Sequence, residues 1–198
     1  MNPIFHKAKR TVSRISWRGE SGQAIMEFAA VVVMLMVLIF GAIDFCRAIY
    51  LRQEMVNLSR ETANLEARGA GTTTMEIMTN ALAAAILEAQ PLGLNSSTGM
   101  VIVTAVTNVY GKGGTVSYTI SQQYTAGTLA GAQSRIGTST NVGNAAVMPS
   151  TGGTYLTSNR TVYVAEIYYQ FFPITPVGNF IKAVLPTQFY DAAYFSSL

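Results

Sequence analysis

The sequence predicts an α+β protein, in which a long N-terminal transmembrane helix continues into a small head of a second helix and an antiparallel sheet of about four strands. Three patterns indicate this fold. Residues 28–43 are sixteen consecutive uncharged and mostly apolar residues. Beyond them, apolar residues recur at spacings of three and four, as on an amphipathic helix. The second half of the chain contains alternating apolar and polar runs, which are typical of strands. The apolar stripe of a helix and the apolar face of a sheet must each be shielded from water, and here they can shield each other. We therefore expect these elements to form one domain.

The apolar run is long enough to span a membrane. Residues 28–43 alone cover about 24 Å, and adding residues 24–26 gives a span of about twenty residues that encloses Glu27. We assign residues 23–45 to a transmembrane helix. No small-x-small cleavage site follows it, so we expect the helix to remain as an anchor.

Charge sets the expected orientation. Residues 1–22 carry five cationic side chains and one carboxylate, whereas residues 23–198 carry eight cationic side chains and nine carboxylates. The positive-inside rule then predicts a cytoplasmic leader at 1–22 and an extracytoplasmic domain at 46–198. Because the excess positive charge belongs to the leader, the head is not expected to bind nucleic acid.

The first helix is expected to continue from Asp44, since no proline occurs before Pro91, and to end at Gly69 and Gly71. A second amphipathic helix is predicted at 74–89. The buried stripe predicted for the first helix consists of Ala48, Leu51, Met55, Leu58, Thr62 and Leu65, and that of the second of Met75, Met78, Leu82, Ala85, Ile86 and Ala89.

Strands are predicted at 101–110 and 116–124, joined as a hairpin through 111–114, and at 161–171 and 188–195. Alternation assigns two sets of side chains to one face each: Val116, Tyr118, Ile120, Gln122 and Tyr124 on the second strand, and Tyr163, Ala165, Ile167, Tyr169 and Phe171 on the third.

Two connecting segments complete the chain. Residues 125–159 hold twenty Gly, Ser, Thr or Asn residues among 35, which predicts an exposed loop rather than a packed element. Apolar residues at helical spacing predict a short helix within 177–185.

The residue types argue against an enzyme. The single histidine, His6, lies in the leader, so no histidine-based catalytic or metal site can form in the head, and we expect no metal, cofactor or small-molecule substrate. Glu166 interrupts an aromatic strand; we favour an edge or solvent-facing position for it over a buried one. A pairing of Glu166 with Asp191 for glycan hydrolysis stays open, because it rests on residue type alone. The other head acids are expected on solvated helix faces: Glu54, Glu61, Glu66, Glu76 and Glu88.

The start of the apolar run resembles a family signature. A basic leader ends at Gly22, the next residue is Gln23, and Glu27 stands fifth after the glycine. This pattern resembles the type IV prepilin leader. The longer strings "GQA", "EFA" and "GAIDFCRA", the mixed helix up to Arg68-Gly69 and the C-terminal "VYVAEIYYQFFPIT" are similar to the TadE-like proteins of the tight adherence (Flp) pilus system.

The resemblance implies a pilin-like fold and three site residues. A prepilin peptidase would cut between Gly22 and Gln23, and the Glu27 carboxylate would pair with the free amine of a neighbouring subunit's first residue. Pilins that build the main filament usually begin with an aromatic or aliphatic residue, and Gln23 is neither. The alternative is that Glu27 has no role in assembly and is an edge residue whose side chain reaches water near the cytoplasmic face.

The expected function is therefore a non-catalytic, minor pilin-like (pseudopilin) component that is required for pilus assembly. Its expected partners are the bacterial inner membrane, the prepilin peptidase and other pilin-like and Tad assembly proteins, and it either stays in the membrane or is released into a pilus. The first alternative is an uncleaved, signal-anchored protein of the same family. The second is a membrane-anchored periplasmic enzyme or ligand-binding head that uses the 125–159 loop.

Overall fold

A computed structural model describes residues 20–69, 73–92, 94, 97–110, 116–138, 143–149, 160–183 and 185–197. The chain forms two compact units, Met1–Phe40 and Gly41–Leu198, and each is described by itself. The elements in chain order are α1 (Glu20–Arg68), α2 (Thr74–Glu88), the 3-10 turn η1 (Gln90–Leu92), β1 (Gly99–Tyr110), β2 (Val116–Gly127), β3 (Thr161–Gln170), α3 (Gly178–Ile181) and β4 (Gln188–Ser196).

The predicted membrane span lies in α1. Within the described residues, α1 is the helix that is long and apolar enough to cross a membrane, by length and composition. Its large apolar side chains from Ile25 to Ile39 are mostly exposed, so they need a lipid or protein environment. The helix ends as predicted next to Gly69, which has a φ of +66°.

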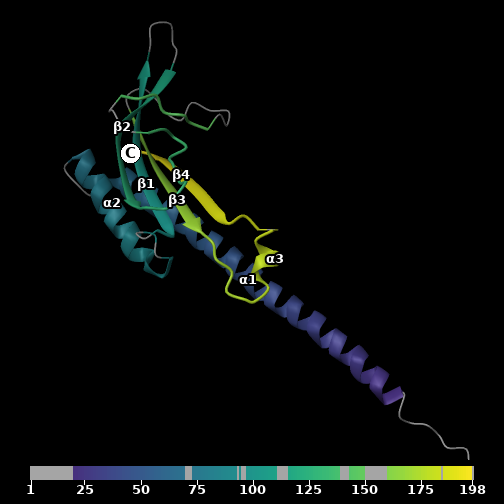
Figure 1. Cartoon of the computed structure of the whole chain (residues 1–198). Coiled ribbons are helices and arrows are strands. Elements are labelled where there is room, and N and C mark those ends of the chain that lie inside the picture. The colour runs from purple at the N-terminus through teal and green to yellow at the C-terminus, as the bar shows by residue number, and fades with distance from the viewer. Residues whose placement is uncertain are drawn as a thin grey trace, which may run out of the picture. The chain divides into compact units, whose positions relative to one another are not determined.

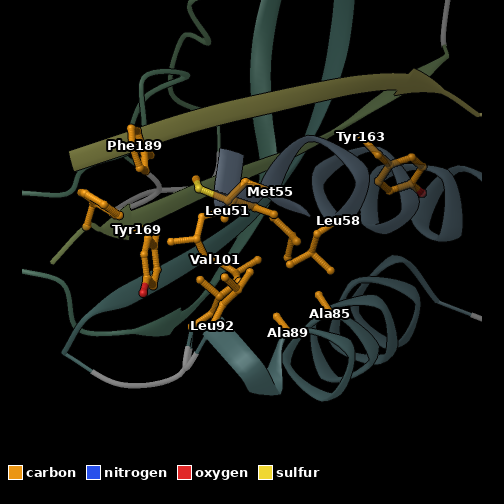
Figure 2. Close-up of a cluster of buried hydrophobic side chains, with 14 of the residues drawn as sticks. Leu51, Met55, Leu58, Ala85, Ala89, Leu92, Val101, Tyr163, Tyr169 and Phe189 are labelled. Carbon is orange, nitrogen blue, oxygen red and sulfur yellow. The ribbon is translucent and has the colours of Figure 1, made fainter. Parts of the chain in front are cut away.

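Unit Gly41–Leu198 contains a four-stranded antiparallel sheet in the order β2-β1-β3-β4. Figure 1 shows the strands side by side, with α2 beside β1 and β2. One sheet face packs on the part of α1 after Asp44 and on α2, and we call it the inner face. Figure 2 shows this core. Leu51, Met55 and Leu58 come from α1, Ala85 comes from α2, and Ala89 directly follows the end of α2. Leu92 comes from η1, and the strands contribute Val101, Tyr163, Tyr169 and Phe189.

Most of the predicted stripes are buried as expected, but α2 differs at its start. Met78 and Ala85 are buried, whereas Met75 is 56% exposed. Ala81, which the periodicity placed outside the stripe, is buried instead. The buried stripe therefore runs towards the start of the helix through the half-buried Thr74 and Ile77 and does not include Met75.

The predicted single face of β2 is wrong, because a β-bulge interrupts the strand. Ala105 pairs with Gln122 and Val106 with Ile120, so Ser121 is the extra residue. A bulge reverses the side-chain alternation beyond it. Tyr124 therefore packs in the inner-face core, whereas Tyr118 packs on the opposite, outer face with Val106, Ile136, Val162 and Val164.

The predicted exposed loop at 125–159 is partly a packed cover of the outer face. β2 continues to Gly127, Leu129 packs with Ile102 and Tyr168, and Ile136 is fully buried. Residues 143–147 run along the edge of β2, where the Ile120 N–H donates to the Asn144 carbonyl at 2.8 Å. The polar composition hid these few apolar residues, which cover a sheet face that could not stay in water.

The short helix predicted within 177–185 is only partly correct. α3 covers four residues, and Phe180 is 78% exposed rather than packed. Several expectations fall outside the described residues: the leader up to residue 19 with His6, Gly71, the hairpin turn at 111–114, Val184, and residues 139–142 and 150–159 of the loop.

Gly127 provides a test of the fold. Its φ is +91°, and a Cβ there would overlap the carbonyl oxygens of Leu94 and Gly99. Gly131 has a φ of +79° but open space around it, which makes it the matched control. We expect Gly131→Ala to cost about 1 kcal/mol and Gly127→Ala about 3 kcal/mol or more, because only the second adds an overlap to the backbone strain.

The measurement is the thermal unfolding midpoint of the full chain in detergent, monitored by circular dichroism. Each kcal/mol should lower Tm by about 2–4 °C in a chain of this size. Equal midpoints for the two variants would contradict the close approach at Gly127.

Candidate functional site

The three site residues predicted at the N-terminus lie on successive turns of α1. Gly22 and Gln23 are already helical, because α1 begins at Glu20. The Gln23 side-chain amide donates to Glu27 Oε1 at 3.0 Å, one turn away. No atom lies within 4 Å of a Cβ built at Gly22, so nothing packs against the helix at this point. A protease that binds extended backbone would need to unwind this first turn, and a glycine makes unwinding easier than an alanine by about 1 kcal/mol.

A second site, which the sequence reasoning missed, lies at the end of the predicted span. Asp44 is fully buried, and its carboxylate accepts hydrogen bonds from the Ile174 N–H at 3.0 Å and from the Thr175 hydroxyl. One turn on, the Arg47 guanidinium donates to the Phe172 carbonyl at 2.6 Å and lies 5.7 Å from the Phe171 ring centroid. We call these contacts the Asp44–Arg47 clamp. The sequence feature that could have indicated this site is Asp44 followed three residues later by Arg47, directly after the apolar run.

A third feature is a shallow groove between α1 and β4. Hollows of about 350, 430 and 340 Å³ lie along α1, and each pair of hollows has lining residues in common: Val56 for the first and second, Asn57 for the first and third, and Arg60 and Phe195 for the second and third. Apolar and charged side chains alternate along this groove, which resembles a protein-contact surface more than an enclosed ligand pocket. We call it the α1–β4 groove; its lining includes Ile49, Arg52, Val56, Arg60, Asp191, Ala193 and Phe195.

Residues 22–64 match the family model described as TadE-like protein. The chain carries a TadE-like segment. This confirms the resemblance to TadE-like proteins of the tight adherence pilus system over the matched residues. The TadE-like segment contains Gly22, Gln23 and Glu27, both residues of the Asp44–Arg47 clamp, and the α1 side of the α1–β4 groove. No curated protein and no solved structure matches the chain.

Outside the TadE-like segment, Glu166 departs from its favoured interpretation. The edge or solvent-facing position is wrong, because Glu166 is fully buried on the central strand β3. Its carboxylate accepts hydrogen bonds from the Arg135 N–H at 2.8 Å, from the Tyr190 hydroxyl at 3.0 Å and from the Ser134 hydroxyl. Burial, together with the negative charge of Glu166, raises the pKa of Tyr190. The hydroxyl therefore stays protonated and acts as the hydrogen-bond donor to Glu166. The buried carboxylate thus fastens the loop cover to the sheet.

Glu166 and Asp191 do not form the carboxylate pair that the sequence left open. Glu166 pairs with Ala192 and Asp191 with Ile167, so the two acids occupy adjacent register positions and opposite faces. Asp191 lies on the inner face, where its carboxylate accepts a hydrogen bond from the Ser59 hydroxyl of α1 at 2.5 Å. Glycoside hydrolysis needs two carboxyl groups on either side of one bond, and this geometry does not supply them. Among the described residues, no group of three or more His, Cys, Asp or Glu could hold a metal ion.

Glu66, just beyond the TadE-like segment, is also buried rather than on a solvated face. Neither of its carboxylate oxygens has a hydrogen-bond partner among the described residues. Burial raises its pKa well above the usual value of 4.5, because the charged form loses its hydration and gains no hydrogen bond from the described residues in exchange. Burial also raises the pKa of the neighbouring Tyr163 phenol, and Glu66 adds to this shift when its carboxyl is ionised.

Glu66 predicts a pH-dependent stability. Above pH 4.5 the unfolded chain releases this proton while the folded chain keeps it, so folding stability falls as pH rises towards the raised pKa. We expect Glu66→Gln to be about as stable as the parent near pH 4, and then to gain on it by up to about 1.4 kcal/mol per pH unit.

The check is a set of urea midpoints of the full chain in detergent between pH 4 and pH 8. Glu61→Gln is the control, since Glu61 lies on the exposed face of the same helix. Parallel pH profiles for the parent and Glu66→Gln would exclude the raised pKa.

Proposed function

We propose that the protein is a non-catalytic, minor pilin-like component of a tight adherence pilus system, required for pilus assembly and acting by protein contact. The observation that carries this proposal is the TadE-like match over residues 22–64, which supports involvement in the Tad pilus system. The matched residues include both the glycine and the carboxylate of the prepilin-type signature.

The proposed location is the inner membrane, with the N-terminus in the cytoplasm and the head in the periplasm. Two observations support it. α1 is apolar over a length sufficient to span a bilayer, and its large apolar side chains are exposed. The excess of cationic residues precedes this span, as the positive-inside rule requires of a cytoplasmic flank.

The proposed processing step links Gly22, Gln23 and Glu27. Cleavage after Gly22 would turn the Gln23 backbone nitrogen into a free ammonium group, which a neighbouring subunit's Glu27 could pair with. An unpaired charge costs about 2.5–3.5 kcal/mol at the bilayer centre and less near the edge, where Glu27 lies one turn from the start of the span, so a partner would stabilise assembled subunits by less than this amount. The hydrogen bond from the Gln23 side chain satisfies one Glu27 oxygen within the chain and leaves the other for a partner.

The uncleaved, signal-anchored form is the rival within the same class. One observation favours it, because the Gly22–Gln23 peptide lies inside a helix instead of an extended segment. In either form, the α1–β4 groove is the surface that we assign to contact with other assembly components, since it combines apolar side chains with Arg52 and Arg60.

The first prediction concerns cleavage. Expressed with prepilin peptidase, the protein should lose the mass of residues 1–22 and begin at Gln23, and without the peptidase it should begin at its original N-terminus. Gly22→Leu should abolish processing because a side chain cannot enter a cleft that accepts glycine. Gly41→Ala is the control, since Gly41 is also helical and also has no atom within 4 Å of its built Cβ. Intact mass spectrometry measures all three, and an unprocessed parent would establish the anchored rival.

The second prediction concerns Glu27. Glu27→Gln should leave membrane insertion unchanged but reduce the number of pili per cell, counted by electron microscopy, because the amide cannot pair with an ammonium charge. Glu54→Gln, on the same helix but outside the lining of the α1–β4 groove, should retain normal piliation. In a Gly22→Leu background, Glu27→Gln should have no additional effect, since no new amine is formed. Normal piliation in the Glu27→Gln strain would remove the pairing role.

A further inference from the structure

The connection between β3 and β4, residues 171–187, carries a cluster of exposed apolar side chains. Phe172 is 48% exposed, Ile174 66% and Phe180 78%. Soluble surfaces rarely gather large apolar side chains in one short segment unless something covers them. Other exposed apolar residues of this unit, such as Leu87 on α2 and Val147 in the loop cover, lie on separate segments.

The Asp44–Arg47 clamp fixes this connection to α1 at one level. Ile174 and Thr175 are bound by Asp44, and the Phe172 carbonyl is bound by Arg47. At its other end, Leu185 and Pro186 line a small hollow together with Phe45 and Ile49 of α1. Both ends of the connection therefore meet α1 between residues 44 and 49.

That level is where α1 would leave the bilayer. The predicted span ends at Phe45, and the clamp uses its last turn and the turn that follows. Phe172 and Ile174 are thus held beside the point at which an apolar helix passes from lipid to water, and Phe180 lies further along the same connection, between its two attached ends. Interfacial segments place aromatic and aliphatic side chains at this depth, at the boundary of headgroups and acyl chains.

We propose that the β3–β4 connection is a membrane-contacting foot, in which Phe172, Ile174 and Phe180 insert into the lipid surface on the side where the head lies. The proposal rests on the membrane anchoring of the proposed function and adds a second contact with lipid to it. Charge agrees with this occupant. Lys182 is exposed and is the sole charged residue between positions 171 and 187, so no carboxylate in the segment opposes anionic headgroups.

The foot constrains the head in a way that a single helix cannot. One transmembrane helix leaves the head free to tilt about the point of exit. A second contact, tied to the same helix by the Asp44–Arg47 clamp, would fix which face of the head is turned to the membrane. The α1–β4 groove would then be presented to neighbouring membrane proteins at a constant height.

The test measures depth in a bilayer with nitroxide labels. Full-length protein with Cys46→Ser, which removes the single cysteine, receives one cysteine at a time by Phe172→Cys, Ile174→Cys or Phe180→Cys. Leu35→Cys reports the span, and Leu87→Cys and Val147→Cys are exposed apolar controls. The samples are liposomes of phosphatidylethanolamine and phosphatidylglycerol that contain no other protein.

Each label is probed with oxygen, which concentrates in lipid, and with a water-soluble nickel chelate. We expect labels at 172, 174 and 180 to collide preferentially with oxygen, like the label at 35, whereas labels at 87 and 147 collide preferentially with nickel. Labels at 172, 174 and 180 that behave like position 87 while position 35 stays in lipid would overturn the foot and leave the anchor intact. An aqueous label at 35 would overturn the anchor and the foot together.

A second arm tests the clamp. Asp44→Asn weakens the acceptor for Ile174 and Thr175, so the label at 174 should shift towards nickel accessibility while the label at 35 does not change. Arg160, exposed and distant in sequence from the clamp, provides the control variant Arg160→Gln, which should leave position 174 in lipid. An unchanged label at 174 in Asp44→Asn would show that the clamp does not hold the foot.

Discussion

Burial of one α1 stripe against the inner face of the sheet is the interaction on which the rest of the head depends. Leu51, Met55 and Leu58 supply most of the α1 side of this core. The same helix, further towards its N-terminus, exposes apolar residues all round, as a membrane span does. Asp44 lies between the exposed apolar part of α1 and the part that packs on the sheet. Its carboxylate can be buried because Ile174 and Thr175 donate hydrogen bonds to it.

The outer face of the sheet is also apolar and must be shielded from water, but a loop covers it instead of a helix. A single bulge at Ser121 turns Ile120 and Tyr118 to this side, and a polar loop supplies the few apolar residues that cover them. Glu166 then fixes the loop by accepting from Ser134, Arg135 and Tyr190. A buried carboxylate with three donors is specific in its geometry, so it defines where the loop lies better than apolar contact alone would. The sheet is therefore covered by helices on one face and by a fastened loop on the other.

The elements that follow from local periodicity were predictable from the sequence, and those that depend on strand order were not. The helical spacing of Ala48, Leu51 and Met55 identifies the buried stripe of α1 without knowledge of its partner. Glu166 looked like an edge residue because nothing local shows that β3 is central or that a loop covers its outer face. Glu66 looked solvated for the same reason, since only the tertiary fold buries it beside Tyr163. The Asp44–Arg47 clamp joins residues more than a hundred positions apart, beyond the range of any periodicity.

The separation in the clamp has a consequence for the order of events during synthesis. Asp44 and Ile174 are 130 positions apart, so the carboxylate leaves the ribosome long before its partner exists. Until β3 has been made and has paired with β1, Asp44 and Arg47 must remain hydrated, because an unpaired charge is costly to bury. A chain truncated before residue 174 would retain its whole helix yet lack the contact that closes the head around it. Completion of the clamp thus requires synthesis at least as far as Thr175, well after the whole of α1 has been made.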